Sequence, residues 1–371
     1  MSLVNTSQSS KLDDFLPQEQ AALLALKQKV THAFVTGAGG FLGKAICERL
    51  LAVGIKVTGF ARGQYPELNA MGVEMVKGDI ADEQALLDGM QGCDLVFHVA
   101  SKAGVWGSKQ SYFSPNVDGA RHIINACKQR NIERLVYTST PSVTFAGVDE
   151  AGNDESAPYA KQFLNFYGES KAIAEQMMLS ANGEPLANGK LLGTTALRPH
   201  LIWGPNDPHL VPRVLERAEV GKLKLVGRED KLVDTIFVGN AAYAHILAAL
   251  TLSNGVVEGM PNSAACAGKA YYLSNDEPIT MAAMLNKILA CRNLPPVTKR
   301  VPTHLAYMAG YLLESVYSLL GKQDEPIMTR FVARQLSTSH YFDISAAKQD
   351  LGYQALVSID EGMERLKASL R

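Results

Sequence analysis

Short apolar runs alternate with stretches of helical spacing along the first half of the chain, and this alternation constrains the fold more than any other feature. Strands that are apolar along their whole length are typical of a parallel sheet whose two faces are both covered by helices. The sequence therefore predicts a doubly wound α/β domain, in which a ligand binds at the carboxyl ends of the strands. The predicted strands are His32–Thr36, Lys56–Ala61, Val73–Lys77, Asp94–Ala100, Glu133–Ser139 and Thr194–Ile202, and the predicted helices are Phe41–Val53, Glu83–Met90, Val117–Arg130 and Gln162–Ser180.

A glycine-rich turn, Thr36–Gly43, joins the first predicted strand to the first predicted helix. Glycine permits a tight turn and the close approach of a pyrophosphate, and the helix N-terminus offers free N–H groups to the phosphates. A plain glycine turn is the simpler reading, but the strand–turn–helix context is the one that a dinucleotide site requires. The residues predicted to bind the dinucleotide here are Gly37, Gly40, Phe41, Leu42 and Gly43.

The end of the second predicted strand, Gly59–Arg62, indicates which dinucleotide is bound. NAD sites place an acidic residue roughly 20 residues after the glycines, where it binds the ribose 2′-hydroxyl. No acidic residue stands here, and Arg62 can pair with a 2′-phosphate. The segment favours NADP(H), with a solvated strand-end arginine as the alternative. Asp79, which closes the third strand, is expected to reach the adenine amino group or else to cap a turn.

The alternation ends near Trp203, where Pro205, Pro208 and Pro212 interrupt the chain. A chain of 371 residues exceeds the usual size of one domain, so we expect a second lobe. The elements predicted in this part are a helix at Val211–Val220, a short strand pair at Leu223–Gly227 and Lys231–Phe237, a helix at Asn240–Leu252 and a strand at Tyr271–Ser274. The expected divisions are an N-terminal helical extension over residues 1–30, a Rossmann domain over residues 31–203, and a smaller, mostly α-helical substrate-binding lobe over residues 204–371, from which residues 232–253 return to the Rossmann domain.

Composition and charge narrow the possible partners. Hydrophobic residues make up 47% of the chain and charged residues 20%, which is ordinary for a globular protein with a sizeable core. The formal net charge is −1 and no block of lysines or arginines occurs, so binding to nucleic acid or anionic lipid has little electrostatic support. We expect a small-molecule partner and no nucleic acid.

The five cysteines are scattered without a Cys-x-x-Cys pair, so we expect free thiols in a reducing compartment and no metal site. The N-terminus is polar and lacks the apolar core of a signal peptide. The most apolar stretch, Leu305–Leu320, is shorter than the roughly 20 residues that cross a bilayer, and it contains Glu314. The sequence predicts a cytoplasmic protein without a transmembrane span, in which this stretch is a core helix or a surface-docked one.

Tyr167 and Lys171 stand four residues apart in a predicted helix, so both side chains lie on one face of it. A phenol has an unperturbed pKa near 10, which makes it a poor acid–base group at neutral pH. A neighbouring ammonium group, and the positive nicotinamide of an oxidised cofactor, favour the tyrosinate and lower that pKa. The pair, placed on the helix after the fifth predicted strand, therefore predicts an acid–base site.

Hydroxyl groups end the fifth predicted strand, at Thr138, Ser139 and Thr140. A hydroxyl there can donate to a substrate oxygen and stabilise a developing alkoxide beside the tyrosine. We assign this role to Thr140, with Ser139 as the second choice. Capping of the strand-to-loop turn is the alternative for at least one of the three.

These motifs together resemble the extended short-chain dehydrogenase/reductase family, and within it the 3β-hydroxysteroid dehydrogenase branch. The segments that carry the resemblance are Thr36–Gly43, Asp79, Thr138–Thr140, Tyr167–Lys171 and Arg198-Pro199. It runs from about Thr31 to the end of the chain, including Phe342–Ile344. Arg198–Pro208 is similar to sterol 4α-carboxylate 3-dehydrogenases, whereas Ser101–Gly107 is similar to bacterial 2-alkyl-3-oxoalkanoate reductases of long-chain olefin biosynthesis. Gly168 departs from the proline that often follows the family's tyrosine.

The resemblance implies an enzyme of lipid metabolism in which NADPH gives a hydride to the C3 ketone of a long-chain β-keto acid. It implies that Tyr167 protonates the alkoxide, that Lys171 binds the nicotinamide ribose and lowers the tyrosine pKa, and that Thr140 orients the carbonyl. Further cofactor contacts are expected from Ile80, Ala100 and Pro199.

The substrate carboxylate needs a positive partner, for which Lys102 is the candidate and a solvated loop lysine the alternative. Trp106 and Trp203 are candidates for the lining of an acyl tunnel, although aromatic residues in such places are more often ordinary core. The resemblance also implies a homodimer, in which the helices predicted at Val117–Arg130 and Gln162–Ser180 pack against their copies, and an association with other enzymes of the same pathway.

Three other functions compete with this one. A 3β-hydroxysteroid or sterol 4α-carboxylate 3-dehydrogenase uses the same catalytic groups on a rigid substrate. A nucleotide-sugar epimerase keeps a tightly held NAD, which the missing acid near Arg62 disfavours. A non-catalytic scaffold that senses NADPH has no need of Tyr167, Lys171 and Thr140 together.

Overall fold

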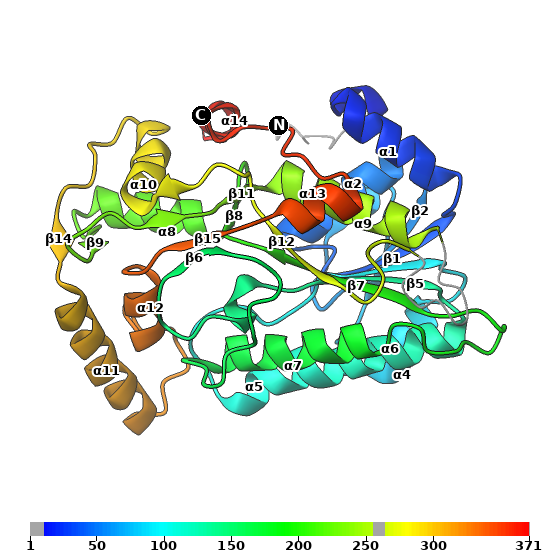
Figure 1. Ribbon diagram of the computed structural model, residues 1–371, viewed down its shortest axis with the longest axis horizontal. Helices are drawn as coiled ribbons and strands as arrows, with labels where there is room; N and C mark the ends of the chain where they lie inside the picture. Colours follow the sequence, from blue (N-terminus) through cyan, green and yellow to red (C-terminus); the bar gives the residue numbers. More distant parts are fainter. Residues whose placement is uncertain (1–10, 255–263, 371) are drawn as a thin grey trace, which may run out of the picture.

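A seven-stranded parallel sheet forms the centre of the molecule in the computed structural model, which describes residues 11–254 and 264–370 (Figure 1). Its strands, in spatial order, are β12 (Ala270–Leu273), β7 (Gly193–Pro199), β5 (Arg134–Thr138), β4 (Leu95–His98), β1 (His32–Thr36), β2 (Lys56–Ala61) and β3 (Glu74–Lys77). Every residue of β1 and β7 is buried, as expected for strands covered on both faces. The predicted doubly wound α/β fold is therefore confirmed.

The order of the strands reverses between β1 and β4, because the chain first builds β2 and β3 on one side of β1 and then crosses to the other. Ligands bind doubly wound sheets in the crevice at such a reversal, beyond the carboxyl ends of the strands. The order of the strands thus places the candidate site between the carboxyl ends of β1 and β4.

Helices cover the two faces of this sheet and enclose two separate apolar cores (Figure 1). One face carries α1 (Pro17–Lys27), α2 (Phe41–Ala52) and α9 (Val238–Leu252), and the other carries α4 (Glu83–Gly89), α6 (Gly119–Arg130) and α7 (Phe166–Ser180). The N-terminal helix α1 is held to α2 by a buried ion pair between Glu19 and Arg49, at 2.5 Å. Helix α9 is buried almost all round and packs against β5 and β7 of the central sheet.

The second half of the chain also supplies β12, which pairs with β7 and completes the central sheet. The sequence predicts this strand without predicting its place in the sheet. The remaining strands are short and form a four-stranded sheet of β13 (Ile279–Thr280), β10 (Leu232–Val233), β15 (His340–Phe342) and β6 (Glu150–Asn153), and two pairs, β11 (Ile236–Phe237) with β8 (Ile202–Trp203) and β14 (Arg300–Val301) with β9 (Leu225–Val226). The remaining helices of four or more residues are α3 (Pro66–Met71), α5 (Lys109–Phe113), the π-helix η2 (Ser114–Asp118), α8 (Leu210–Glu219), α10 (Met281–Ala290), α11 (Thr303–Leu319), α12 (Arg330–Gln335), α13 (Ser345–Leu351) and α14 (Ile359–Ser369).

Two predictions about strands are wrong. The segments at Leu223–Gly227 and Lys231–Phe237 do not pair with each other, because β9 pairs with β14 and β10 with β13 and β15. The run Thr194–Ile202 is not one strand, since Leu201 takes a left-handed backbone conformation with φ of 48° and separates β7 from β8. Among the described residues, no helix has both the length and the apolar content that crossing a membrane requires.

Candidate active site

A cleft of about 1010 Å³ opens where β1, β4, β5 and β7 end, at the reversal of the strand order. The structure brings all the residues predicted to bind the cofactor to this cleft. They are Gly37, Gly40, Phe41, Leu42, Gly43, Arg62, Asp79, Ile80, Ala100, Tyr167, Lys171 and Pro199. Ser139, Thr140 and Lys102 line it as well, so one cavity holds the nucleotide motif and the acid–base groups.

The glycine turn is a close-fitting cradle at the start of α2. Gly37 has a φ of 67°, and a Cβ atom there would lie 3.0 Å from the backbone of Ala100. A Cβ atom on Gly43 would lie 2.1 Å from the carbonyl oxygen of Gly37. Side chains are therefore excluded at both positions, which leaves backbone N–H groups and the N-terminus of α2 facing the cleft. These features fit a bound pyrophosphate.

The rim that would hold the adenosine end is formed by Arg62, Tyr65 and Asp79. Arg62 is exposed and makes no ion pair within the part of the chain that the structure describes. Asp79 lies in the cleft wall and also accepts a hydrogen bond from the N–H of Ala81 at 3.0 Å, so it caps a turn. Tyr65 was not predicted; its ring covers Gly39, where a Cβ atom would lie 2.1 Å from it. This contact joins residues from two loops and leaves no local sequence signal.

Lys171 is buried on the inner side of α7, one turn after Tyr167. Its ammonium group donates to the carbonyl of Thr138 at 2.6 Å and lies 4.2 Å from the centre of the Tyr137 ring. Burial lowers the pKa of Lys171 to about 7, and the carboxylate of Glu175, one further turn along α7, opposes that shift. The lysine is thus fixed against the end of β5, with its charge held by a carbonyl and an aromatic face.

Tyr167 differs from the prediction in its electrostatics. Burial raises its pKa above the ordinary value, and a hydrogen bond with Thr140 partly offsets the shift. Lys171 does not contribute to this shift, and its ammonium group donates to the carbonyl of Thr138. In the structure without a cofactor the phenol is therefore protonated at neutral pH and is a weaker acid than a group whose pKa lies near that pH.

The two predicted hydroxyl residues have different surroundings. Thr140 caps a short turn, accepting from the N–H of Ser142 at 3.2 Å, and also bonds Tyr167. The hydroxyl of Ser139 is buried and has no hydrogen-bond partner among the described residues. Thr140 is therefore the residue whose hydroxyl contacts Tyr167, whereas the neighbouring hydroxyl of Ser139 makes no hydrogen bond among the described residues.

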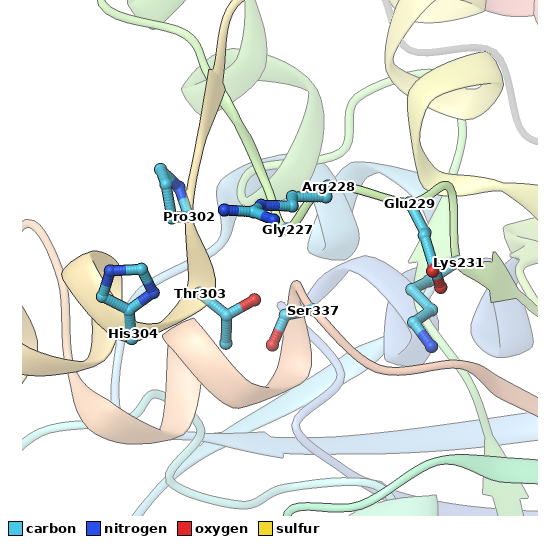
Figure 2. Close-up of a pocket in the computed structure, with 8 residues that line it drawn as sticks. All are labelled: Gly227, Arg228, Glu229, Lys231, Pro302, Thr303, His304 and Ser337. Atoms are coloured by element: carbon cyan, nitrogen blue, oxygen red, sulfur yellow. The ribbon is translucent and has the colours of Figure 1, made fainter.

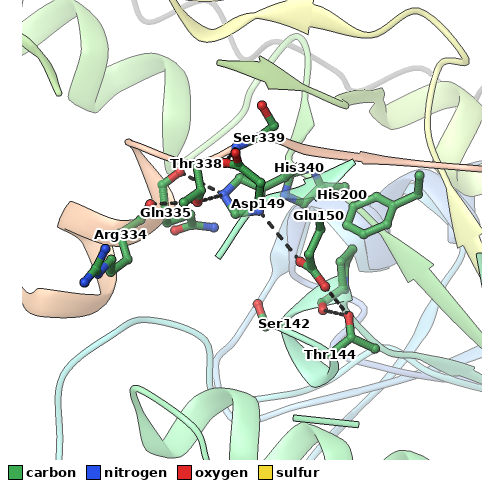
Figure 3. Close-up of polar contacts among 12 residues, drawn as sticks. Ser142, Thr144, Asp149, Glu150, His200, Arg334, Gln335, Thr338, Ser339 and His340 are labelled. Atoms are coloured by element: carbon green, nitrogen blue, oxygen red, sulfur yellow. Dashed lines mark hydrogen bonds and ion pairs between the residues drawn. The ribbon is translucent and has the colours of Figure 1, made fainter. Parts of the chain in front are cut away.

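A buried polar cluster anchors the loop that carries Thr140 (Figure 3). The hydroxyl of Thr144 lies 2.7 Å from a carboxylate oxygen of Glu150, whose other oxygen is 3.7 Å from His340 on β15. Figure 3 shows these side chains pointing toward one another behind the loop. The contacts tie the loop after β5 to β15, a strand that lies far along the chain, so the position of Thr140 depends on that strand.

Lys102 stands in the loop after β4 and lines the cleft. The amide side chain of Asn116, in the π-helix η2, bonds both the N–H and the carbonyl of Lys102, at 2.7 and 3.1 Å. The ammonium group donates to Ser111 at 2.7 Å and lies over the Tyr112 ring. No carboxylate of the described residues pairs with it, so it keeps a charge available for an anionic ligand.

The structure does not bring the two predicted tryptophans to the cleft. Trp203 is fully buried, donates to the hydroxyl of Thr235 at 3.2 Å and packs against Phe237. Trp106 donates to the carbonyl of Lys322 at 3.0 Å and so joins the loop after β4 to the segment after α11. Both are structural contacts between elements distant in sequence, which spacing alone cannot reveal.

A doubly wound sheet, a glycine cradle and a tyrosine–lysine pair in one cleft define an oxidoreductase of the short-chain dehydrogenase/reductase type, which acts on a CH–OH or C=O group. The chain belongs to the 3-beta hydroxysteroid dehydrogenase/isomerase family, whose pattern matches residues 34–295.

Relatives with known names agree with that membership. The chain is 69% identical over 354 residues to the 2-alkyl-3-oxoalkanoate reductase of Shewanella oneidensis, covering 95% of this chain and 90% of the relative. It is 48% identical to the enzyme of the same name from Stenotrophomonas maltophilia, covering 90% and 98%. It is 34% identical to the decarboxylating sterol-4-alpha-carboxylate 3-dehydrogenase of Mus musculus, covering 91% and 90%.

Solved structures share the fold at lower identity. The epimerase Mth375 of Methanothermobacter thermautotrophicus superposes with a TM-score of 0.72 at 17% identity, covering 96% of both chains. MoeE5, solved with UDP-glucose and NAD, superposes with a TM-score of 0.69 at 21% identity, covering 92% of this chain and 98% of the other. These likenesses confirm the architecture.

Proposed function

We propose that this protein reduces a long-chain 2-alkyl-3-oxoalkanoate to the 2-alkyl-3-hydroxyalkanoate with NADPH. The observation that carries the proposal is the 69% identity, along nearly the whole chain, to a 2-alkyl-3-oxoalkanoate reductase. The presence of Tyr167, Thr140 and Lys171 in one cleft with the glycine cradle supports turnover over a sensing role.

In this proposal each catalytic side chain has a separate task. NADPH, when bound, supplies the hydride for the ketone carbon. Tyr167 donates its proton to the ketone oxygen, since a phenol is protonated at neutral pH. Thr140, already bonded to Tyr167, orients the same oxygen. Lys171 would hold the nicotinamide ribose from the end of β5.

We assign Arg62 to the 2′-phosphate of the cofactor and Lys102 to the carboxylate of the substrate. Arg62 is exposed at the cleft rim without an ion-pair partner among the described residues, which suits a 2′-phosphate. Lys102 has neutral partners in Ser111 and Tyr112, which suits the substrate carboxylate. NAD in the solved neighbour MoeE5 supports a nicotinamide cofactor of some kind.

A sterol 4α-carboxylate 3-dehydrogenase is the second candidate, because the mouse enzyme of that name covers the same part of the chain. The segment that resembles the sterol enzymes is divided between two environments. Arg198 and Trp203 are buried away from the cleft, whereas Pro199, Leu201, Ile202 and Asp207 line it. The identity to the Shewanella reductase is 69%, whereas the identity to the mouse sterol enzyme is 34%.

The test compares a homologous series of 2-alkyl-3-keto acids, assayed with NADPH, with a 4α-carboxysterol assayed with NADP⁺ and NAD⁺. Each buried methylene contributes about 0.8 kcal/mol, so kcat/KM is expected to climb with chain length until the binding site is filled. Tyr167→Phe is expected to lower kcat by about 10²-fold or more, since it removes the proton donor. Tyr341→Phe, on β15 outside the cleft, is the matched control. A flat series together with brisk sterol oxidation would assign the protein to the sterol enzymes.

Two further proposals concern the setting of the enzyme. We propose that it works in the cytoplasm, in keeping with five buried and unpaired cysteines, and that its product passes to other enzymes of long-chain olefin biosynthesis. We also propose a homodimer built on α6 and α7. Most of the apolar residues that suggested the dimer (Ile123, Ile124, Ala126, Ala172 and Met178) face the core, so the outer residues of α7 would make the contact.

A further inference from the structure

Tyr65 lines the catalytic cleft, and no step of the proposed reaction uses it. It follows Arg62 closely in the loop between β2 and α3. Its backbone carbonyl accepts from the N–H groups of Leu68 and Asn69, at 3.0 and 3.3 Å, so the start of α3 fixes the point from which the side chain extends. Pro66, the first residue of α3, restricts the backbone of Tyr65 further.

The ring of Tyr65 is held between two glycines from separate loops. A Cβ atom on Gly39 would lie 2.1 to 2.4 Å from three carbon atoms of the ring, and one on Gly63 would lie 3.0 Å from a ring carbon. Neither glycine takes a left-handed conformation, so the space filled by the ring, and not the shape of the turn, excludes a side chain at Gly39. The ring also packs against the larger apolar core. The side chain is therefore held in place before a ligand binds, which reduces the entropy lost on binding.

The hydroxyl of Tyr65 is a free donor close to Arg62. Its oxygen lies 3.1 Å from the place of a Cβ atom on Gly63, the residue that follows Arg62. The hydroxyl makes no hydrogen bond to another residue in the described ranges, and the guanidinium group of Arg62 makes neither a hydrogen bond nor an ion pair there. No acidic residue occurs in the segment Gly59–Pro66. Both residues line the cleft, so its adenosine end presents two donors that have no partner in the described part of the chain.

A phosphate group fits these two donors better than a ribose hydroxyl does. Its terminal oxygens accept several hydrogen bonds at once, and bonds to a charged oxygen are shorter and stronger than neutral ones. A single hydroxyl oxygen offers fewer acceptor sites. Asp79, the carboxylate of the same rim, accepts from the N–H of Ala81 within its own turn and makes no ion pair with Arg62, so the arginine is left to pair with the ligand.

We propose that Tyr65 is a second determinant of cofactor choice, whose hydroxyl donates to the 2′-phosphate of NADP(H) beside Arg62. The inference rests on the proposed use of NADPH, and it assigns the discrimination to a pair of residues and not to the arginine alone. The ring and the hydroxyl have separate tasks. The ring closes the wall beside the glycine turn for either dinucleotide, whereas the hydroxyl distinguishes the phosphorylated one.

A different hollow also carries cations and would attract phosphate weakly. It has a volume of about 290 Å³, lies at the start of α11 and is lined by Arg228, Lys231 and His304 among others (Figure 2). Lys231 is paired with Asp149 at 3.0 Å, Glu229 adds a negative charge, and Arg228 and His304 are exposed. None of the side chains that line this hollow is buried. It lacks a donor held in place as Tyr65 is, and it therefore supplies a control for unspecific attraction of phosphate.

The experiment compares the binding of NADP⁺ and NAD⁺, which differ only in the 2′-phosphate, to the purified full chain by isothermal titration calorimetry. No substrate is present, so the result does not depend on turnover. Tyr65→Phe keeps the ring and removes the hydroxyl. It is expected to lower the affinity for NADP⁺ about tenfold, as for one lost hydrogen bond to a charged group, and to leave the affinity for NAD⁺ within about twofold.

Two control variants and one variant of the ring's surroundings accompany Tyr65→Phe. Tyr341→Phe, outside the cleft, and Arg228→Gln, in the hollow at α11, are expected to bind both dinucleotides like the unaltered protein. Gly39→Ala is expected to weaken the binding of NADP⁺, because its Cβ atom would displace the ring. In Tyr65→Ala that space is empty, so adding Gly39→Ala is expected to cause no further loss.

Equal losses for NADP⁺ and NAD⁺ in Tyr65→Phe, or unchanged binding of both, would overturn the role of the hydroxyl and leave the 2′-phosphate to Arg62. Failure of the proposed function gives other results. An unaltered protein that binds NAD⁺ as tightly as NADP⁺ would overturn the use of NADPH and this inference together. A protein that prefers NADP⁺, loses that preference in Tyr65→Phe and reduces no keto acid would overturn the proposed substrate and leave the role of Tyr65 supported.

Discussion

At the scale of single residues, the proposed function assigns cofactor choice and proton transfer to a few charged and polar side chains in the cleft. Lys171 lies among apolar and aromatic groups, and its nearest carboxylate, Glu175, is itself paired with Arg198 at 2.6 Å and accepts from Tyr159 at 2.7 Å. No local sequence motif reveals this buried ion pair. Its Glu175 lies one helical turn after Lys171 and opposes the lowering of the lysine pKa by burial. Lys171 is therefore coupled to a buried ion pair that joins α7 to β7.

Lys171 should make the stability of the cofactor-free protein depend on pH. Its pKa is about 7 in the folded chain and near 10.4 in the unfolded chain. Between these values the unfolded state binds more protons, so this group raises stability as pH rises through that window. The urea midpoint of the unaltered protein, minus that of Lys171→Met, is expected to increase from pH 7 to pH 10. If the difference between the two urea midpoints stays constant or falls over this range, the pKa of Lys171 is not lowered in the folded protein.

Arg62 should set the preference for NADPH. Losing one charge-assisted contact to a phosphate costs about 1.5–3 kcal/mol, so Arg62→Ala is expected to lower the NADPH/NADH ratio of kcat/KM about tenfold or more. Arg121→Ala, an exposed arginine of α6 paired with Asp118, is the control and should leave the ratio unchanged. An Arg62→Ala enzyme with the original ratio would mean that another group reads the 2′ position.

At the scale of single elements, the glycine turn both packs closely against its own backbone and lines the cleft. A Cβ atom on Gly43 would meet the carbonyl carbon and oxygen of Gly37, which are backbone atoms without an alternative rotamer. Gly43→Ala is expected to destabilise the protein by roughly 1–3 kcal/mol and to weaken cofactor binding. Thermal unfolding with and without NADPH measures both effects. A variant that is as stable as the parent and still stabilised by NADPH would show that the turn can open without loss.

The elements that the sequence predicts well are those whose signals are local. Strands β1 and β2 begin and end where the apolar runs do, and α7 ends at Ser180 as expected. Helix α7 begins at Phe166 and not at Gln162, because the side chain of Asn165 accepts from the N–H of Gly168 and caps it. That cap is visible in the sequence as an asparagine before a helical run, and could have been predicted.

The elements that the sequence does not predict depend on distant partners. Strand β9 pairs with β14, and β6 pairs with β15, across long stretches of chain, and strands of two to four residues carry no periodicity. In the site, the glycine turn and the pair Tyr167 and Lys171 are local motifs and could be placed, whereas the contacts of Asn116 and Tyr65 arise only when separate loops meet.

For the whole molecule, the two apolar cores leave α11 and the outer side of α7 as separate surfaces. Figure 1 places α7 along one long side of the molecule and α11 at its end. A dimer on α7 would therefore leave the exposed apolar side chains of α11 uncovered. Each surface should respond to substitutions of its own residues and not to those of the other.

The homodimer is testable on this basis. Ile173 of α7 is partly exposed, one turn before Met177, which is partly exposed as well. Light scattering at micromolar concentration is expected to give a dimer for the unaltered protein and for Leu312→Glu, and a monomer for Ile173→Glu, because a charge in the contact would lose its hydration. A monomeric unaltered protein would refute the dimer. A dimer that persists in Ile173→Glu and separates in Leu312→Glu would move the interface to α11.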